Sequence, residues 1–161
     1  MQIIEYENKY EQDVKDLLVE LEEYIVSIDK DELDVVGQDY REKMIWYDLK
    51  DVKENNGKCF IAVENEKAVG VIMGKIKKYS EVDYLDYKCP KAGRITELVV
   101  TKNIKSKGVG TMLVNKMEEY FKNMDCEYVS VDVFAYNENA LNFYSKFGYH
   151  ARMIDTIKKL D

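Results

Sequence analysis

The sequence predicts a mixed α/β fold, in which helices flank a central β-sheet. Segments whose apolar residues recur at helical spacing are separated by short apolar or alternating runs that are typical of strands. They follow one another in the order strand, two helices, two or three strands, helix, strand, helix, strand. The 161 residues suit one domain, from residue 1 to residue 161, with a core large enough to be stable.

The N-terminal part of the chain is expected to contribute a strand, two helices and a hairpin. Ile3 to Tyr6 alternates, whereas the next two segments place apolar residues three and four positions apart. Trp46 falls within the second helix, where we expect it to lie partly in the core. Two apolar runs then flank the polar turn Glu64–Lys67, which is the pattern of an antiparallel hairpin. The expected ranges are a strand at 3–6, helices at 11–28 and 40–56, and strands at 59–63 and 68–76.

The segment from Tyr79 to Gly93 has no regular periodicity and contains the only proline, Pro90. We expect a loop, and its length favours a functional explanation. Its mixture of tyrosines and carboxylates suits the edge of a site for an amine. An ordinary loop explains the same composition equally well.

The C-terminal part of the chain is expected to alternate strands and helices. Asn137 can cap a short helix, and Gly148 can end it. The expected ranges are a strand at 95–100, a helix at 108–124, a strand at 128–133, a helix at 137–148 and a closing strand at 149–158.

One predicted strand runs into a basic loop and a helix start that carries two glycines, Gly108 and Gly110. Side chains at these positions would obstruct a close ligand. The free backbone N–H groups at a helix N-terminus, together with the helix dipole, favour an anion such as a phosphate. Lys105 and Lys107 add positive charge at the same place. The segment therefore predicts a phosphate-binding loop.

Two common phosphate loops do not fit this segment. The dinucleotide fingerprint needs a third glycine where Leu113 stands, and the nucleotide-triphosphate loop needs Gly-Lys-Ser/Thr where Gly110 is followed directly by Thr111. A strand-to-helix junction also uses glycines for backbone reasons alone. Taken in isolation, the segment leaves both explanations open.

Composition excludes several classes of protein. Cys59, Cys89 and Cys126 are odd in number and form no Cys-x-x-Cys, which disfavours a disulfide framework and a zinc site and suits a reducing cytoplasm. The single histidine, His150, leaves too few soft ligands for a transition metal, so we expect no metal. No apolar run reaches membrane-spanning length, and the first residues do not resemble a signal peptide. We therefore expect a cytoplasmic protein without a membrane partner.

The net charge of −7 is unevenly distributed along the chain. Residues 1–57 carry 17 acidic and 7 basic side chains, whereas residues 58–161 carry 14 and 17, so the two parts have net charges of −10 and +3. A nucleic-acid partner is not expected, because such proteins show a dominant basic face. The division suits a protein that binds an anionic cofactor with its C-terminal part and a cationic substrate with its N-terminal part. A merely solvated acidic helix pair is the alternative.

A second motif lies in the helix predicted after Asn137. Here the chain has Asn-x-x-Ala-x-x-Phe-Tyr-x-Lys-x-Gly-Tyr, formed by Asn137, Ala140, Phe143, Tyr144, Lys146, Gly148 and Tyr149. With the earlier Lys105-x-x-Gly108-x-Gly110, it resembles the GNAT superfamily of N-acetyltransferases, whose pyrophosphate loop is Gln/Arg-x-x-Gly-x-Gly/Ala. Lys105 departs from that pattern, which keeps the positive charge but loses the bidentate fork of arginine. The resemblance is detailed from about Phe60 onward.

The resemblance implies a fold and a cofactor site. The fold would be a mixed, mostly antiparallel sheet of six to seven strands flanked by about four helices. Acetyl-CoA would be the co-substrate, with its pantetheine arm paired to the strand backbone at Leu98, Val99 and Val100. Its pyrophosphate would lie on N–H groups from Lys105, Ser106, Lys107, Gly108, Val109, Gly110 and Thr111. The later motif would complete the cofactor site with Asn137, which hydrogen-bonds the arm, and with Ala140, Tyr144 and Lys146.

Two residues are candidates for catalysis. Transfer of an acetyl group to an amine requires removal of the ammonium proton and stabilisation of the departing thiolate. Glu97 lies on an otherwise apolar strand and shares a face with Val99, and many family members carry a glutamate here that accepts the amine proton. Its alternative is a solvated position paired with Arg94. By resemblance the Tyr144 hydroxyl donates to the leaving sulfur, and its alternative is an aromatic residue that only packs.

We therefore expect an N-acetyltransferase that uses direct transfer in a ternary complex, because no cysteine lies near either motif. The acceptor would be a primary amine of a small cationic molecule or of a protein or peptide. A non-catalytic acyl-CoA-binding sensor or partner module is the alternative. Dimers are common in the family, which makes a homodimer the oligomer that the resemblance allows.

Overall fold

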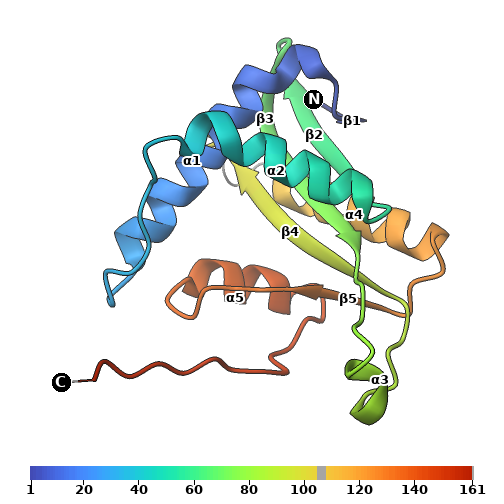
Figure 1. Cartoon of the computed structure of the whole chain (residues 1–161). Coiled ribbons are helices and arrows are strands. Elements are labelled where there is room, and N and C mark those ends of the chain that lie inside the picture. Colours follow the sequence, from blue (N-terminus) through green and yellow to red (C-terminus); the bar gives the residue numbers. More distant parts are fainter. Residues whose placement is uncertain (105–107, 161) are drawn as a thin grey trace.

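A computed structural model describes residues 1–104 and 108–160 and contains one five-stranded sheet (Figure 1). The strand order is β1-β2-β3-β4-β5, with antiparallel pairing as far as β4 and parallel pairing of β4 with β5. The sheet is therefore mixed and mostly antiparallel, as predicted. The strands are β1 (Gln2–Glu5), β2 (Lys58–Glu64), β3 (Lys67–Ile76), β4 (Ala92–Val100) and β5 (Tyr128–Val131).

Helices cover both faces of the sheet and create two cores (Figure 1). On one face α1 and α2 pack against alternate residues of β2, β3 and β4, and on the other face α4 and α5 do so. Each helix places its apolar residues on one stripe, which is why helical spacing located these segments. The helices are α1 (Glu11–Ile28), α2 (Tyr40–Glu54), α3 (Asp83–Asp86), α4 (Val109–Asn123) and α5 (Glu138–Ser145), with short 3-10 turns η1 (Asn8–Tyr10) and η2 (Lys102–Ile104).

Helix α4 lies very close to the sheet. A Cβ atom built on Gly93 of β4 would stand 2.4–2.6 Å from the ring of Phe121, which is fully buried in α4. Glycine at this position therefore allows the aromatic ring to rest on the strand backbone. The contact fixes α4 against β4, and with it the helix N-terminus that carries Gly108 and Gly110.

The prediction of six to seven strands is wrong: the described residues form five. The missing element is the closing strand expected at 149–158, where every side chain from His150 to Leu160 is exposed and Figure 1 shows an extended trace. Alternation is required to give a strand one buried face. The apolar residues of this segment do not alternate, and they stay exposed at Met153, Ile154, Ile157 and Leu160.

The prediction of about four helices misses α3, which lies in the segment expected to be a loop. The turn that leads into it is stabilised by reciprocal hydrogen bonds between Ser80 and Asp83. Asp83 Oδ2 accepts from the backbone N–H and from the hydroxyl of Ser80, and Ser80 Oγ accepts from the Asp83 N–H at 3.3 Å. The spacing Ser80-x-x-Asp83 is the sequence signal of this capping box.

Trp46 does not lie partly in the core as expected. Its side chain is exposed on the outer side of α2, with the ammonium of Lys50 at 5.0 Å from the ring centroid. Residues one turn apart define a helix face, and the buried face of α2 contains Ile45 and Val52 instead.

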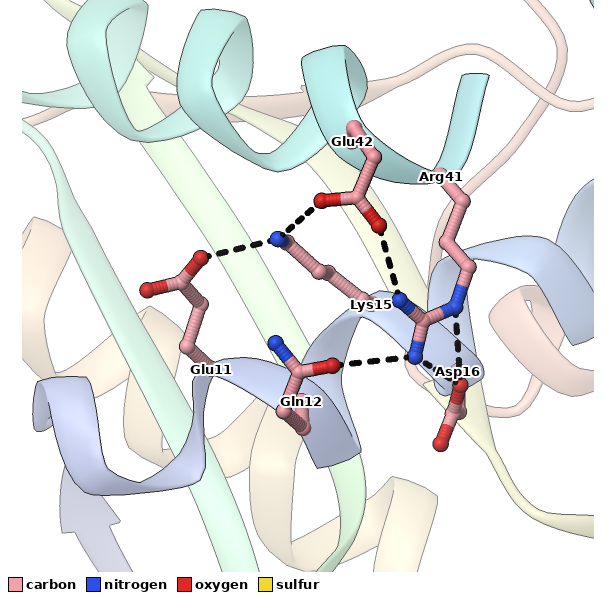
Figure 2. Close-up of polar contacts among 6 residues, drawn as sticks. All are labelled: Glu11, Gln12, Lys15, Asp16, Arg41 and Glu42. Atoms are coloured by element: carbon pink, nitrogen blue, oxygen red, sulfur yellow. Dashed lines mark hydrogen bonds and ion pairs between the residues drawn. The ribbon is translucent and has the colours of Figure 1, made fainter. Parts of the chain in front are cut away.

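A charged network fixes α2 against α1 (Figure 2). Lys15 of α1 is almost fully buried, and its ammonium binds Glu11 at 3.0 Å and Glu42 of α2 at 2.6 Å. Arg41 binds the other oxygen of Glu42 at 2.9 Å and Asp16 at 2.7 Å. A buried ammonium is tolerated only when it is paired in this way. The network fixes the first turn of α2 against α1. Asp48 follows on the same helix, one to two turns later.

In the described ranges, no helix is both long enough and apolar enough to cross a membrane.

Candidate active site

The site begins where β4 and β5 separate (Figure 1). Parallel pairing joins Ala92–Ile95 of β4 to Tyr128–Val131 of β5 and stops there, whereas β4 continues to Val100 and stays paired with β3. From Thr96 onward the edge of β4 that faced β5 therefore has no strand partner among the described residues. Backbone N–H and C=O groups on such an edge can pair with an extended ligand. Leu98, Val99 and Val100 lie in this stretch.

A β-bulge at Thr96 determines the direction of Glu97. Met73 of β3 pairs with Glu97 and the next residue, Gly74, pairs with Ile95, so Thr96 has no partner in the register. Bulges of this kind re-aim side chains. Before the bulge Ile95 packs into the core of α4, and after it Val99 packs into the core of α1 and α2. Glu97 alternates with Val99 and is directed toward α1 and α2.

Glu97 is surrounded by other acidic residues. Burial raises the pKa of its carboxyl to about 8, and the negative charges of Asp48 on α2 and Glu22 on α1 contribute to this shift. A carboxylate is disfavoured both by loss of water and by like charges nearby. Arg94 does not neutralise Glu97, because its guanidinium pairs with Asp132. Glu97 itself is partly buried.

Asp48 is the second unusual carboxyl of the site. Its pKa is raised to about 6, chiefly by burial and then by the charge of Asp51. Oδ2 of Asp48 is buried and has no hydrogen-bond partner among the described residues. Glu22 is bound more firmly, since its Oε2 accepts the Tyr40 hydroxyl at 3.4 Å. Burial also raises the Glu22 pKa.

Tyr144 of α5 is buried, and the charge of Glu97 acts on its hydroxyl. Its side chain is 6% exposed and packs edge-on against the rings of Phe143 and Tyr149. Burial raises the pKa of the Tyr144 hydroxyl above its usual range, and the charge of Glu97 adds to the shift. The hydroxyl therefore keeps its proton at neutral pH. Tyr144 is thus a packed aromatic residue whose hydroxyl stays protonated.

The N-terminus of α4 lies beside the same opening. Gly108 precedes the helix in the left-handed conformation, at φ 76°, and its carbonyl accepts the first helical bond, from the Met112 N–H at 3.0 Å. The N–H groups of Val109, Gly110 and Thr111 come before this first bond and therefore have no carbonyl partner within the helix. The first turn of α4 contains no acidic residue. A Cβ on Gly110 would lie 3.3 Å from the ring of Phe143. The predicted contributors Lys105, Ser106 and Lys107 lie outside the described residues.

Asn137 acts as the N-cap of α5. Its Oδ1 accepts from the Ala140 N–H at 3.0 Å and from the hydroxyl of Tyr24 on α1 at 3.4 Å. Lys146 follows the helix and is exposed. Asn137 and Lys146 flank the short helix that carries Tyr144. The cap that fixes the start of α5 therefore also fixes how far Tyr144 reaches into the core.

Sequence reasoning missed Asp48 and Tyr40. The signal was present in the helical spacing of α2: Asp48 lies three residues after Ile45 and four before Val52, both of which are buried. A carboxylate on the buried face of an amphipathic helix is unusual enough to mark a site. In the described part of the chain, no group of three or more His, Cys, Asp or Glu residues could hold a metal ion.

Comparison with known proteins relates the chain to acetyltransferases. The family model described as "Acetyltransferase (GNAT) family" matches residues 20–149. The uncharacterized N-acetyltransferase MJ1207 of Methanocaldococcus jannaschii is 26% identical over 109 residues, which are 68% of this chain and 46% of that protein. N-alpha-acetyltransferase 30 of Xenopus laevis is 31% identical over 91 residues, which are 56% of this chain and 31% of that protein. The chain thus spans about half or less of the length of these relatives.

Solved structures with the same fold cover almost the whole chain. A mutant form of the BH1408 protein from Bacillus halodurans superimposes with a TM-score of 0.85 at 16% identity, over 99% of both chains. Aminoglycoside N-acetyltransferase AAC(6')-Iy in complex with CoA superimposes with a TM-score of 0.68 at 14% identity, over 99% of this chain and all of the other. At such identities the likeness concerns the fold.

Proposed function

This chain belongs to the GNAT family of acetyltransferases, and on that premise we propose that it transfers an acetyl group from acetyl-CoA to a primary amine. The proposal is carried by two groups at the opening where β4 and β5 separate: Glu97, a partly buried carboxyl with a raised pKa, and Tyr144, a buried hydroxyl that keeps its proton. Amide formation from an ammonium and a thioester requires a base for the ammonium proton and a proton donor for the departing thiolate.

The residues present fit acetyl-CoA. The unpaired edge of β4 offers the backbone of Leu98, Val99 and Val100 to an extended pantetheine arm. The N–H groups at Val109, Gly110 and Thr111 suit a pyrophosphate, and Lys105, Ser106 and Lys107 precede them in the chain. Asn137, Ala140 and Lys146 would line the arm from α5. Acetyl-CoA supplies the activated acetyl thioester.

Glu97 is suited to accept the proton of the acceptor. An alkyl ammonium titrates near ~10 and a normal glutamate near ~4, so an ordinary carboxylate is a poor base for it. Raising the pKa of Glu97 to about 8 narrows this difference greatly. Proton transfer is most efficient when the catalytic pKa lies near the working pH. Glu97 is thus the general base of the proposed reaction.

Tyr144 is suited to protonate the departing sulfur. Its raised pKa keeps the hydroxyl protonated, so a donor is available when negative charge develops. The cysteines lie elsewhere, and Cys59 is buried with its pKa raised by that burial. Direct transfer between the two bound substrates therefore requires no covalent intermediate on the protein.

The acceptor is proposed to be cationic. The side of the site formed by α1 and α2 contributes Glu22 and Asp48, both acidic, and belongs to the N-terminal part of the chain with a net charge of −10. The names of similar proteins include an N-alpha-acetyltransferase and aminoglycoside N-acetyltransferases. Both peptides with a free N-terminus and small amines are therefore assayed as acceptors.

The test is release of free CoA from acetyl-CoA with a panel of amines and peptides, measured with a thiol reagent. We expect release that depends on an amine acceptor, with the acetylated product identified by mass. Calorimetric titration with CoA measures cofactor binding separately. Tight CoA binding without turnover of any acceptor would favour the non-catalytic module, and lack of CoA binding would overturn the proposal altogether.

A further inference from the structure

We propose that α1, together with residues 29–34 after it, bridges the two diverging strands β4 and β5 and holds open a gap as wide as one extended chain. The side chains that connect this α1 bridge to the two sides, chiefly Glu20 and Asp31, are then positioning residues for the pantetheine arm. The inference rests on the proposed function and goes beyond it, because it assigns a role to residues outside both recognised motifs.

The first connection of the α1 bridge lies where β4 ends. Oε1 of Glu20 accepts the backbone N–H of Lys102, two residues after β4, at 2.8 Å. Val99 of β4 also packs in the core that contains residues of α1. A hydrogen bond to an ionised carboxylate is stronger than one between neutral groups. Glu20 thus fixes α1 to the outer end of β4.

The second connection lies where the chain has left β5. Asp31 accepts the hydroxyl of Tyr136 at 2.9 Å, five residues after the end of β5. Tyr24 of α1 adds two longer hydrogen bonds, as donor to Asn137 at 3.4 Å and as acceptor from Asn139 at 3.3 Å. Figure 1 shows α1 running from the end of β4 toward the turn before α5. One helix therefore connects both sides of the opening.

The loop that carries Asp31 is itself held in shape. The carboxylate of Asp29, at the end of α1, accepts the backbone N–H of Asp31 and of two further loop residues, at 2.6–2.9 Å. The ammonium of Lys30 lies 4.9 Å from the ring centroid of Tyr136 and adds a cation–π contact. The loop thus offers Tyr136 a preformed acceptor.

The parallel pairing of β4 with β5 stops although the sequence of β5 would allow it to continue. Pairing ends at Ile95 and Val131, whereas the alternation of Val129, Val131 and Val133 extends two residues further. The bulge at Thr96 starts the divergence of the two strands. Beyond it, the α1 bridge connects the two chains at a distance and prevents them from pairing again.

The length of the α1 bridge matches the width of such a gap. Paired strands lie ~4.8 Å apart, so a single extended chain placed between two others needs two spacings, about 10 Å. From Glu20 to the end of α1 at Ile28 the helix axis rises about 12 Å. The bridge is therefore long enough for one inserted chain and too short for two.

The two sides of the gap suit a chain that contains amides. One side is the unpaired backbone of Leu98, Val99 and Val100. On the other side, Oδ1 of Asn137 accepts the Ala140 N–H at 3.0 Å, so the NH2 end of this amide is the donor that can serve a ligand. Pantetheine has two amide groups along an extended chain and fits this arrangement.

The experiment compares CoA with adenosine 3′,5′-bisphosphate, which keeps phosphates and lacks the pantetheine arm. Calorimetry gives the affinity of CoA, and displacement of CoA gives that of the bisphosphate. Tyr136→Phe removes the hydrogen bond to Asp31 and keeps the ring. We expect its CoA affinity to fall by about 3- to 10-fold, the usual effect of one hydrogen bond, while the affinity for the bisphosphate stays constant.

Matched variants separate the connections from charge and from general damage. Glu20→Gln keeps an oxygen that can accept from Lys102, whereas Glu20→Ala does not, so CoA should bind more weakly to the alanine variant than to the glutamine variant. Tyr79→Phe removes a hydroxyl that donates to the Pro90 carbonyl at 2.8 Å, in the segment before β4. This control should leave the affinities for both ligands unchanged.

Amide hydrogen exchange tests the α1 bridge in the protein without ligand. The Lys102 N–H should exchange faster in Glu20→Ala than in Glu20→Gln, and residues 134–139 should exchange faster in Tyr136→Phe than in the unaltered protein. Unchanged exchange on both sides would show that these contacts do not hold the gap, and would overturn the inference.

The binding outcomes are distinguishable. Weaker binding of CoA, with constant affinity for the bisphosphate and no change in Tyr79→Phe, supports the inference. Unchanged CoA affinity in Tyr136→Phe and Glu20→Ala overturns it and leaves the acetyltransferase proposal standing. Equal losses for CoA and the bisphosphate also overturn it, because the variants would then act on phosphate binding. Failure of the unaltered protein to bind CoA overturns both proposals.

Discussion

At the scale of single residues, the neighbours of Glu97 change the pKa of its carboxyl group. An isolated glutamate would be ionised at neutral pH, whereas burial and the charges of Asp48 and Glu22 raise the pKa of this one to about 8. At pH 7 the free protein therefore holds Glu97 mainly in its protonated form. An approaching ammonium favours the carboxylate, so acceptor binding and activation of the base are coupled.

The pH dependence of kcat/KM tests this assignment. Only deprotonated Glu97 accepts a proton, so kcat/KM should rise with pH and level off above about 8, for an acceptor whose own pKa is near ~10. Glu97→Gln should remove this rise and lower kcat/KM by about 100- to 10,000-fold. The measurement is a pH profile of both proteins. The same rise in the variant would assign it to another group.

The same variant should not lose stability. A carboxyl whose pKa is raised on folding binds more protons in the folded state, so it lowers the free energy of unfolding as pH increases from about 4.5 to about 8. Glu97→Gln removes this cost. Its melting temperature should therefore exceed that of the unaltered protein more at pH 9 than at pH 5, which separates loss of activity from unfolding.

Tyr144→Phe tests the proposed acid. The hydroxyl matters when charge develops on sulfur, so kcat should fall by about 100- to 10,000-fold while CoA affinity stays nearly constant. Tyr149→Phe is the matched control, because it removes a neighbouring hydroxyl that donates to Glu118 at 3.0 Å. The control should cost about 1 kcal/mol of stability without a comparable loss of kcat. Unaltered kcat in Tyr144→Phe, with chemistry rate-limiting, would remove the role.

At the scale of elements, a single irregularity in β4 organises the site. The bulge at Thr96 turns Glu97 and Val99 toward α1 and α2, whereas Ile95 before it faces α4. The same strand continues past the end of β5 and leaves its edge unpaired. One element thus carries the proposed base, Glu97, on its face and unpaired backbone groups on its edge.

The start of α4 gives a prediction at this scale. Gly108→Val should abolish CoA binding while the protein stays folded, because a side chain at this helix start obstructs a phosphate. Gly148→Val is the control, since Gly148 is also left-handed, at φ 85°, and open around its Cβ. Both variants should lose roughly 1–2 kcal/mol of stability from backbone strain. Calorimetry that finds equal CoA affinity in both would exclude the helix start as the phosphate site.

At the scale of the whole molecule, charge is divided between the two sides of the proposed reaction. The N-terminal part, with net −10, forms the proposed acceptor side, and the C-terminal part, with net +3, contains the predicted phosphate loop. Long-range attraction toward exposed carboxylates is screened by salt, whereas contact with buried ones is screened much less. Salt should therefore weaken capture of a cation only partly.

This division predicts a difference between acceptors. kcat/KM for a diamine should fall as salt rises from about 0.1 M to about 1 M, as the Debye length shortens from ~10 Å to ~3 Å, and kcat/KM for a neutral arylamine should change little. The measurement is the salt dependence of both values at constant pH. Identical salt responses of the two acceptors would show that the acidic side chains of the N-terminal part do not attract the acceptor and only keep the surface hydrated.

The sequence alone located the four longer helices and the five strands of the described residues, because a buried face leaves a local period of 3.6 or 2 in the chain. It also proposed Tyr144 and the helix start at Gly108 through two motifs, and Glu97 as a carboxylate on an otherwise apolar strand where many members of the family carry a glutamate. The closing strand at 149–158 was wrong, since an isolated apolar run does not reveal whether a partner edge exists. The helix α3 was missed, although its capping residues are close together in the chain.

Only the tertiary structure brought Asp48, Glu22 and Glu97 together, from α2, α1 and β4. Their spacing along the chain carries no signal of this contact, because the positions of the two helices over the sheet depend on packing and on the network of Lys15 and Arg41. Burial, which raises the pKa of Glu97, is likewise a property of the assembled core. The sequence thus determined which groups could do the chemistry. Folding determined their neighbours and the proton affinity of Glu97, because desolvation and like-charge repulsion arise only when distant elements meet.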